Sequence, residues 1–218
     1  MRGRVRHGSC PTHGMGDSAA VGRSTMRTQR FLRDQFHAFR LWILERPRAR
    51  GPVAPVPVPE GVEFVFLDRH ARRDWVTQRA DDADWEQYRI ALEYEHDLVL
   101  ARRGGKTIGW AWIGYERVYL PPLGREIHLD AGTGYLYDAY VRPAERGRGI
   151  GRCLVSVRCH HADARGIERL LSHVLTGNEP SLRALRTQGF DAVGRTVFLR
   201  ALALRVWTRG PLPAPHAA

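Results

Sequence analysis

The segment from 135 to 151, YLYDAYVRPAERGRGIG, holds the densest set of residues that could do chemistry. A strand-like run ends in Val-Arg-Pro, and three glycines then alternate with other residues as the next helix opens: Gly147, Gly149 and Gly151. Such glycines let the backbone approach a ligand and permit positive φ. Amides at a helix N-terminus bind an anion together with the helix dipole. Arg146 and Arg148 add guanidinium groups suited to phosphate. The segment predicts a pyrophosphate site.

Two common phosphate-binding motifs do not fit these residues. A P-loop needs Gly-Lys-Ser/Thr, whereas Gly151 is followed by Arg152 and Cys153. The dinucleotide fingerprint needs G-x-G-x-x-G after an opening βαβ unit. Its third glycine, expected at 152 or 154, is missing, and the sequence shows no such opening unit. A different phosphate-binding motif is therefore required.

The stretch Arg146-Gly-Arg-Gly-Ile-Gly151 matches the pattern R/Q-x-x-G-x-G/A and resembles the signature of the GNAT superfamily of N-acyltransferases. A second segment, NEPSLRALRTQGF from Asn178 to Phe190, is similar to the family's second motif. That motif has an Asn after the fifth strand, a helix beside the pantetheine arm and a closing Gly-Phe. The order of expected elements is also similar, and the resemblance covers roughly residues 61–207.

The resemblance implies an α/β fold with a mixed, mostly antiparallel central sheet flanked by helices. Two central strands splay in the family, and acyl-CoA inserts between them. Acetyl-CoA is then the acyl donor, and we expect no metal. The residues implied to bind it lie at the strand end, in the glycine-rich turn and at the start of the second motif: Ala139, Tyr140, Val141, Arg146, Gly147, Arg148, Gly149, Ile150, Gly151 and Asn178.

The implied reaction moves an acetyl or similar acyl group from CoA to a primary amine, carried by a small molecule or a peptide, by direct attack in a ternary complex. An amine is protonated at neutral pH and must lose a proton before it attacks. Tyr137 and Asp138 are the candidate catalytic residues, and on a strand they face opposite sides. Asp138 could act directly or through water, or could be hydrogen-bonded structurally.

One position departs from the family pattern. Many members place a Tyr seven residues after the Asn, where it can protonate the leaving thiolate, and this chain has Leu185 there. A Cys, a Ser or water could substitute, or the acid could be unnecessary. The alternative function is therefore a catalytically weak acyl-CoA-binding regulatory module, with membrane-surface association as a further option.

Hydrophobic periodicity and turn residues predict the elements that position these residues. Gly104 and Gly105 mark a hairpin. The acceptor side would be lined by the loop at 116–134 and the helices at 70–94. We expect strands at 62–67, 98–102, 107–115, 135–141, 169–175, 191–199 and 201–207, helical segments at 68–94, 149–164 and 180–188, and a loop at 121–133.

Composition divides the chain into five segments. Residues 1–25 are rich in Gly, Ser, His and Arg and predict disorder, and residues 26–50 predict a basic amphipathic helical extension. Apolar residues from Met26 to Glu45 recur at near-helical spacing between arginines. Such a helix could dock on its own domain or lie on an anionic membrane through residues 26–45. A proline-rich linker at 51–60, the GNAT domain at 61–209 and a flexible tail at 210–218 follow.

Charge and composition exclude several classes of protein. The 218 residues are 43% hydrophobic, enough for a core, and no apolar run approaches the ~20 residues of a membrane span. The net charge is +11, but the first 50 residues carry eleven arginines against three acids and account for +8. We therefore expect no nucleic-acid partner. Three cysteines without a CxxC pair fit a reducing cytoplasm. The family resemblance makes a homodimer an option.

Overall fold

The computed structural model describes residues 36–78, 85–121, 124–201 and 204–210. It confirms the predicted class, a mixed α/β fold with a mostly antiparallel sheet flanked by helices. The elements in chain order are β1 (Phe36–Pro47), η1 (Arg48–Arg50), β2 (Val62–Phe66), α2 (Arg69–Thr77), α3 (Trp85–Glu93), β3 (Asp97–Arg103), β4 (Lys106–Gly114), β5 (Arg117–Leu120), β6 (Arg125–His128), β7 (Thr133–Val141), η3 (Pro143–Glu145), α4 (Ile150–Ala164), β8 (Arg169–Leu175), α5 (Glu179–Arg186), β9 (Asp191–Ala201) and β10 (Leu204–Gly210).

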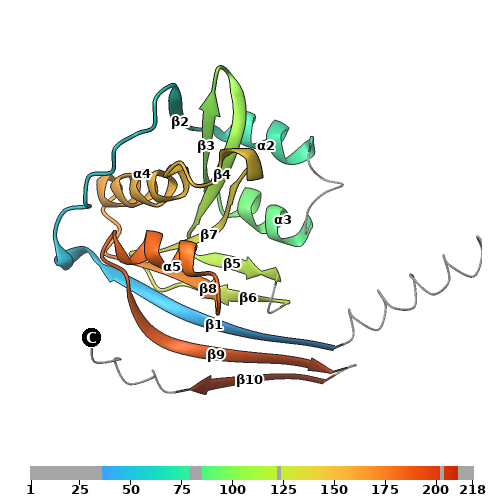
Figure 1. Cartoon of the computed structure of the whole chain (residues 1–218). Coiled ribbons are helices and arrows are strands. Elements are labelled where there is room, and N and C mark those ends of the chain that lie inside the picture. Colours follow the sequence, from blue (N-terminus) through green and yellow to red (C-terminus); the bar gives the residue numbers. More distant parts are fainter. Residues whose placement is uncertain (1–35, 79–84, 122–123, 202–203, 211–218) are drawn as a thin grey trace, which may run out of the picture.

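The main sheet has eight strands in the order β10-β9-β1-β8-β7-β4-β3-β2. Only β7 and β8 pair in parallel within it, and the other neighbours are antiparallel. β1, β9 and β10 run side by side along one side of the molecule (Figure 1). β5 and β6 form a separate two-stranded sheet. β6 lies within the segment 121–133 that is predicted as a loop, and β5 lies just before that segment. That prediction was wrong for β6, because its four residues are too few to show a clear alternation.

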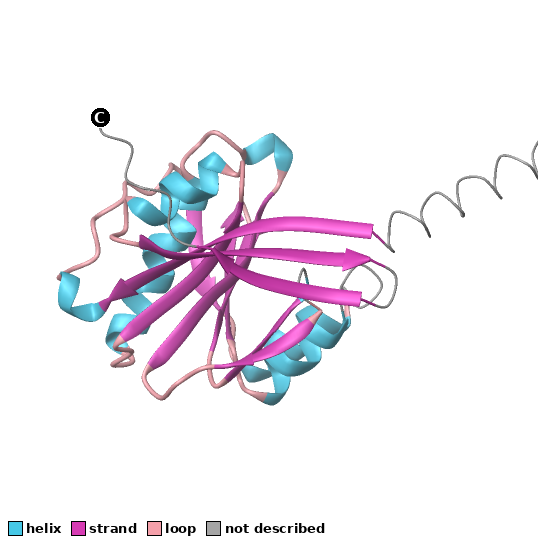
Figure 2. Cartoon of the chain, turned by 90° about the horizontal axis from the view of Figure 1, so that it is seen from below, coloured by secondary structure: helices cyan, strands magenta, loops and turns pink. Residues whose placement is uncertain are grey.

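Helices cover both faces of the sheet (Figure 2). Val76 of α2 and Tyr88 of α3 pack with Trp112 in one core cluster. Val155 of α4 and Leu182 of α5 pack in another cluster on the opposite side. No helix within the described ranges is long and apolar enough to cross a membrane.

The hairpin between β3 and β4 forms where the glycine pair predicted it. Gly104 and Gly105 both have positive φ, 54° and 74°, as a two-residue turn between twisted strands requires. The paired strands place Leu98 and Trp112 opposite each other, both fully buried. A local turn signal and a long-range apolar pair thus agree.

β1 corrects the predicted amphipathic helix for residues 36–45, and residues 26–35 lie outside the described part of the chain. β1 pairs with β8 on one edge and with β9 on the other. Leu41 and Leu44 are 1% and 0% exposed. Their run, LWIL, suits a central strand that is covered on both faces. Pairing with distant strands overrides the local helical spacing, so residues 36–45 do not form the helix on which the option of membrane-surface contact rested.

The proline-rich stretch after β1 packs on α4 and does not act as a free spacer. Val53 is buried at 7% exposure. The Ser156 hydroxyl donates to the carbonyl of Ala54 and the Cys153 thiol to that of Pro57, both at 3.5 Å. The main sheet includes β1, which precedes the predicted domain start at residue 61. The tail from 211 onward lies outside the described residues, and Gly210 is the last residue of β10.

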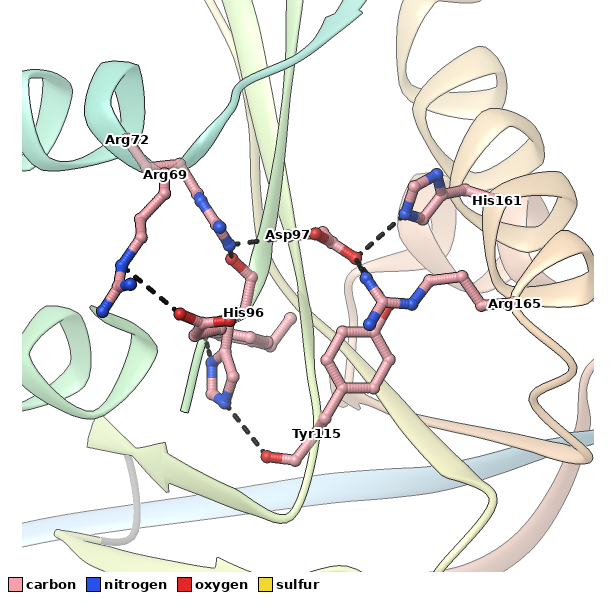
Figure 3. Close-up of polar contacts among 9 residues, drawn as sticks. Arg69, Arg72, His96, Asp97, Tyr115, His161 and Arg165 are labelled. Atoms are coloured by element: carbon pink, nitrogen blue, oxygen red, sulfur yellow. Dashed lines mark hydrogen bonds and ion pairs between the residues drawn. The ribbon is translucent and has the colours of Figure 1, made fainter. Parts of the chain in front are cut away.

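One carboxylate joins elements from both helical layers (Figure 3). Asp97, at the start of β3, accepts hydrogen bonds from the Tyr115 hydroxyl at 2.8 Å, His161 of α4 at 2.9 Å and Arg165 at 2.8 Å. Arg72 of α2 lies 3.8 Å away on its other side. Because Asp97 is largely buried, these charge-assisted contacts are screened little by water. They fix α2 and α4 against the same end of the sheet.

We predict that β1 contributes to the stability of the whole domain. Leu44→Ala removes a fully buried side chain and should lower the free energy of unfolding by about 2–5 kcal/mol, measured by urea denaturation. Val193→Ala on β9, where Val193 is 47% exposed, is the matched control and should have little effect. An unchanged stability for Leu44→Ala would mean that β1 is dispensable.

Candidate active site

The central feature of the site is the point where two neighbouring strands separate. β7 and β8 pair from Thr133–Arg169 to Leu136–Ser172, and the ladder then ends. Both strands continue beyond that pair. The Ser172 hydroxyl donates to the Leu136 carbonyl at 2.9 Å and so closes the last rung. Beyond this rung β7 has no strand partner on the edge that faced β8, and two of its carbonyls, those of Tyr137 and Val141, accept hydrogen bonds from arginine side chains.

A cleft of about 1050 Å³ opens from this divergence. Its walls come from the end of β7, the glycine-rich turn, α4, the end of β8 and the start of α5. The residues of the sequence prediction that line it are Tyr137, Asp138, Ala139, Tyr140, Val141, Arg146, Gly147, Gly149, Ile150, Gly151 and Asn178.

The glycine-rich turn has the backbone that an anion cradle needs. Gly147 and Gly149 have φ of 77° and 81°, in the left-handed region that favours glycine. Gly149 is the N-cap of α4. A Cβ at Gly151, in the first turn of α4, would meet no protein atom within 4 Å. The positive end of the helix dipole therefore faces a space without side-chain obstruction, and these residues fit the pyrophosphate of CoA.

The two arginines of the turn behave differently. Arg146 lines the cleft, and its Nε donates to the Val141 carbonyl at 3.0 Å, so its side chain folds back on the end of β7. Arg148 is not among the residues that line the cleft, and it pairs with Glu145 at 3.5 Å.

A β-bulge sets the direction of Asp138. Tyr140 pairs with Trp110 and Tyr137 with Trp112, so two residues of β7 lie opposite one of β4. Asp138 takes a left-handed φ of 41°, which Asp tolerates better than most residues. Its carboxylate accepts a hydrogen bond from the Tyr88 hydroxyl of α3 at 3.2 Å. Simple alternation along the strand would place Asp138 and Tyr137 on opposite faces. The bulge instead turns the Asp138 carboxylate toward α3.

Tyr137 is held from the interior. Its ring is 4% exposed, and its hydroxyl lies 2.7 Å from Nδ1 of His96. Nε2 of His96 lies 3.2 Å from the Tyr115 carbonyl, which can only accept. Nε2 therefore carries the hydrogen, and Nδ1 accepts from Tyr137. Burial raises the pKa of Tyr137 well above its ordinary value, so its hydroxyl is a protonated donor committed to His96.

At the start of α5 the second motif takes up its expected position. The Asn178 side chain accepts from the Ser181 amide at 3.3 Å and caps the helix. Leu185, in the same helix, is buried and lines the cleft where a hydroxyl was expected from the family pattern.

His173 and Arg158 are among the lining residues of the cleft that the sequence did not predict as site residues. His173 of β8 has Nδ1 3.0 Å from the Tyr135 hydroxyl, and burial lowers the pKa of His173 to about 4. Arg158 of α4 is 2% exposed. A charged residue among the apolar positions of α4 was the signal in the sequence for Arg158. For His173 the signal was the alternation of side chains along β8, which places it on the face opposite that of Ser172.

These features define a member of one family. The model of the acetyltransferase (GNAT) family matches residues 64–190, and the chain belongs to that family. Curated relatives include the mycothiol acetyltransferase of Catenulispora acidiphila, 27% identical over 87% of this chain and 62% of the relative. That of Thermomonospora curvata is 29% identical over 67% of this chain and 50% of the relative. The chain thus spans about half to three fifths of the length of these relatives.

Solved structures show the same fold at low sequence identity. A GCN5-related N-acetyltransferase from Sphaerobacter thermophilus aligns with a TM-score of 0.51 at 16% identity, over 87% of this chain and 58% of that one. A GCN5-related N-acetyltransferase from Kribbella flavida aligns with a TM-score of 0.52 at 14% identity, over 79% and 62% of the two chains.

We predict that His96 makes the fold sensitive to acid. Burial lowers the pKa of His96 from 6.5 to about 4. Below about pH 6.5 the unfolded chain therefore takes up a proton that the folded chain refuses until about pH 4. Stability should fall as the pH falls through this window, by up to about 1.4 kcal/mol per pH unit from this residue.

His96→Gln cannot take up that proton. Urea denaturation between about pH 7 and pH 4.5 should therefore show a lower stability at pH 7 but a shallower loss toward acid. His128→Gln, on the exposed surface of β6, is the matched control and should keep the wild-type slope. Equal slopes for wild type and His96→Gln would contradict the assignment.

Proposed function

We propose that this protein transfers an acetyl group from acetyl-CoA to a primary amine by direct attack within a ternary complex. The observation that carries the proposal is the cleft between the diverging β7 and β8, which has an anion cradle at the N-terminus of α4. Family membership supports the acyl donor. The cleft, about 1050 Å³ in volume and lined from the end of β7 to the start of α5, has room for an extended ligand with a phosphate group.

The proposed donor follows the backbone of the site. Its pyrophosphate would lie on the amides of residues 147–151, where the helix dipole is favourable. Its pantetheine would run along residues 139–141, because the ladder between β7 and β8 has ended and the backbone groups of that edge can bond its amides. The thioester then lies near the last rung, beside Asp138.

The chemical step needs a neutral amine and an acceptor for its proton. The amine nitrogen attacks the thioester carbon, the carbonyl oxygen becomes an oxyanion, and the C–S bond breaks as the intermediate collapses. Asp138 is the candidate to take the amine proton, directly or through water. Its hydrogen bond from Tyr88 keeps the carboxylate oriented, while Tyr137 supports the strand through His96.

The names of the relatives suggest one candidate acceptor, and simpler amines are the other candidates to test. The curated relatives are named mycothiol acetyltransferases, which adds a mycothiol-type acceptor to the candidates. A screen would measure amine-dependent thiol release with this acceptor, with simple primary amines and with a peptide amine. Leu185 in the cleft supports the second candidate, an acyl-CoA-binding module with little turnover. Binding of acetyl-CoA without release of thiol for any amine would favour that module.

We predict that the anion cradle can be blocked without harm to the helix. Gly151→Glu places a carboxylate in the first turn of α4, where acidic residues are stabilising, but beside the proposed pyrophosphate. Calorimetric titration should show acetyl-CoA binding weakened by more than about tenfold.

Gly151→Gln is the matched control for the Glu side chain without its charge and should bind more tightly than Gly151→Glu. Equal affinity of wild type and Gly151→Glu would place the pyrophosphate elsewhere and remove the main support for the proposal.

We predict that Asp138 acts on the rate more than on donor binding. Asp138→Asn keeps the size and the left-handed backbone but cannot take a proton, so the turnover number should drop by about 10²–10⁴-fold. Calorimetry should show acetyl-CoA affinity within about threefold of wild type, because the cradle is unchanged. Thiol release at saturating amine measures the first quantity. A turnover equal to wild type would leave Asp138 with a structural role only.

A further inference from the structure

Arg158 places a positive charge inside the protein, in the lining of the cleft. It lies in the middle of α4 and is 2% exposed. It also belongs to the lining of the cleft, as does Asp138. A buried charge is costly unless it is paired or serves a ligand. Within the described residues, no carboxylate forms an ion pair with Arg158 at 4 Å or less.

Three backbone carbonyl groups accept hydrogen bonds from two of the three guanidinium nitrogens of Arg158. Nε donates to the Leu154 carbonyl one turn earlier in α4, at 2.9 Å. Nη1 donates to the carbonyls of Trp112 at 3.0 Å and of Tyr137 at 3.4 Å. Trp112 and Tyr137 are the pair that borders the bulge. Arg158 thus binds the backbone of β4 at Trp112 and that of β7 at Tyr137, the residue before Asp138.

The second terminal nitrogen is left for a ligand. Nη2 of Arg158 bonds no described residue, although the side chain as a whole is almost completely buried and lines the cleft. Leu185 lines the same cleft and offers no polar group. Arg158 thus brings a positive charge to the level of the strand divergence, where the proposed donor has its thioester.

We propose that Arg158 stabilises the thiolate of CoA as it leaves, through its buried charge and Nη2. The inference rests on the proposed function. When the C–S bond breaks, its electron pair goes to sulfur, and the guanidinium faces the new negative charge while keeping its own protons. The amine proton passes to Asp138 and then to solvent, and the thiolate is protonated by solvent after release. A cation thereby takes the place of the proton donor that is missing at Leu185.

The surroundings keep Arg158 charged in the working pH range. Burial lowers the pKa of Arg158 to about 10, which still leaves a cation at neutral pH. The titratable or charged groups on the elements around it include Asp138 and Tyr137 of β7, His173 of β8, Cys159 of α4 and Arg183 of α5.

The test measures the bound thiol and needs no knowledge of the acceptor. Free CoA is bound to the full chain, and the ultraviolet absorption of its thiolate is titrated against pH, with the protein alone as the baseline for its cysteines. In the wild type we expect the pKa of the CoA thiol to fall by about one unit or more relative to CoA in solution. In Arg158→Met the shift should disappear, and in Arg158→Lys it should persist in part.

Arg73→Met, on the exposed surface of α2, is the matched control and should keep the wild-type shift. A wild-type thiol pKa equal to or above that of free CoA would overturn the inference even if Arg158→Met fails to fold. An undiminished shift in a folded Arg158→Met would also overturn it. Calorimetry separates the two proposals: CoA that binds without a thiol shift removes only this inference, whereas CoA that does not bind removes the proposed function as well.

Discussion

The site depends on one constraint, which is that β7 and β8 stop pairing at Leu136 and Ser172. Two neighbouring strands that separate leave backbone groups that must find other partners. In the proposed complex the pantetheine of the donor would supply them. The bulge in β7 follows directly, and the glycine-rich turn and the start of α4 come after the short helix η3. The position of each chemical group is therefore set by where the ladder ends.

A separated strand needs support from its other edge. β8 receives it from β1, which pairs with the whole of β8 from Leu41–Leu175 to Pro47–Arg169. In the part beyond Ser172, β1 is the strand that holds the wall of the cleft carrying His173. From within, Arg158 and His96 anchor the opposite wall at Tyr137. Both walls of the cleft are thus fixed before any ligand binds, which reduces the entropy that binding must overcome.

Features with local causes could be predicted from the sequence. The Gly104 and Gly105 turn, the strand at 169–175 and the helix after the glycine-rich turn all formed as expected. Features with distant causes could not. The spacing of apolar residues before Glu45 is typical of a helix, and residues 36–45 form a strand because they pair with β8 and β9. The Trp112 and Tyr137 carbonyls that Arg158 binds border the bulge in β7, and no local sequence pattern predicts that bulge.

The order of the strands also has a consequence for how the chain is made. β1 is the first described strand to leave the ribosome, yet its two neighbours, β8 and β9, are among the last. Until they emerge, the edges of β1 and its apolar run have no native partner, which is a condition that promotes association between nascent chains. Such long-range closure also slows folding. The sheet is thus completed late in synthesis, and the cleft can exist only after that.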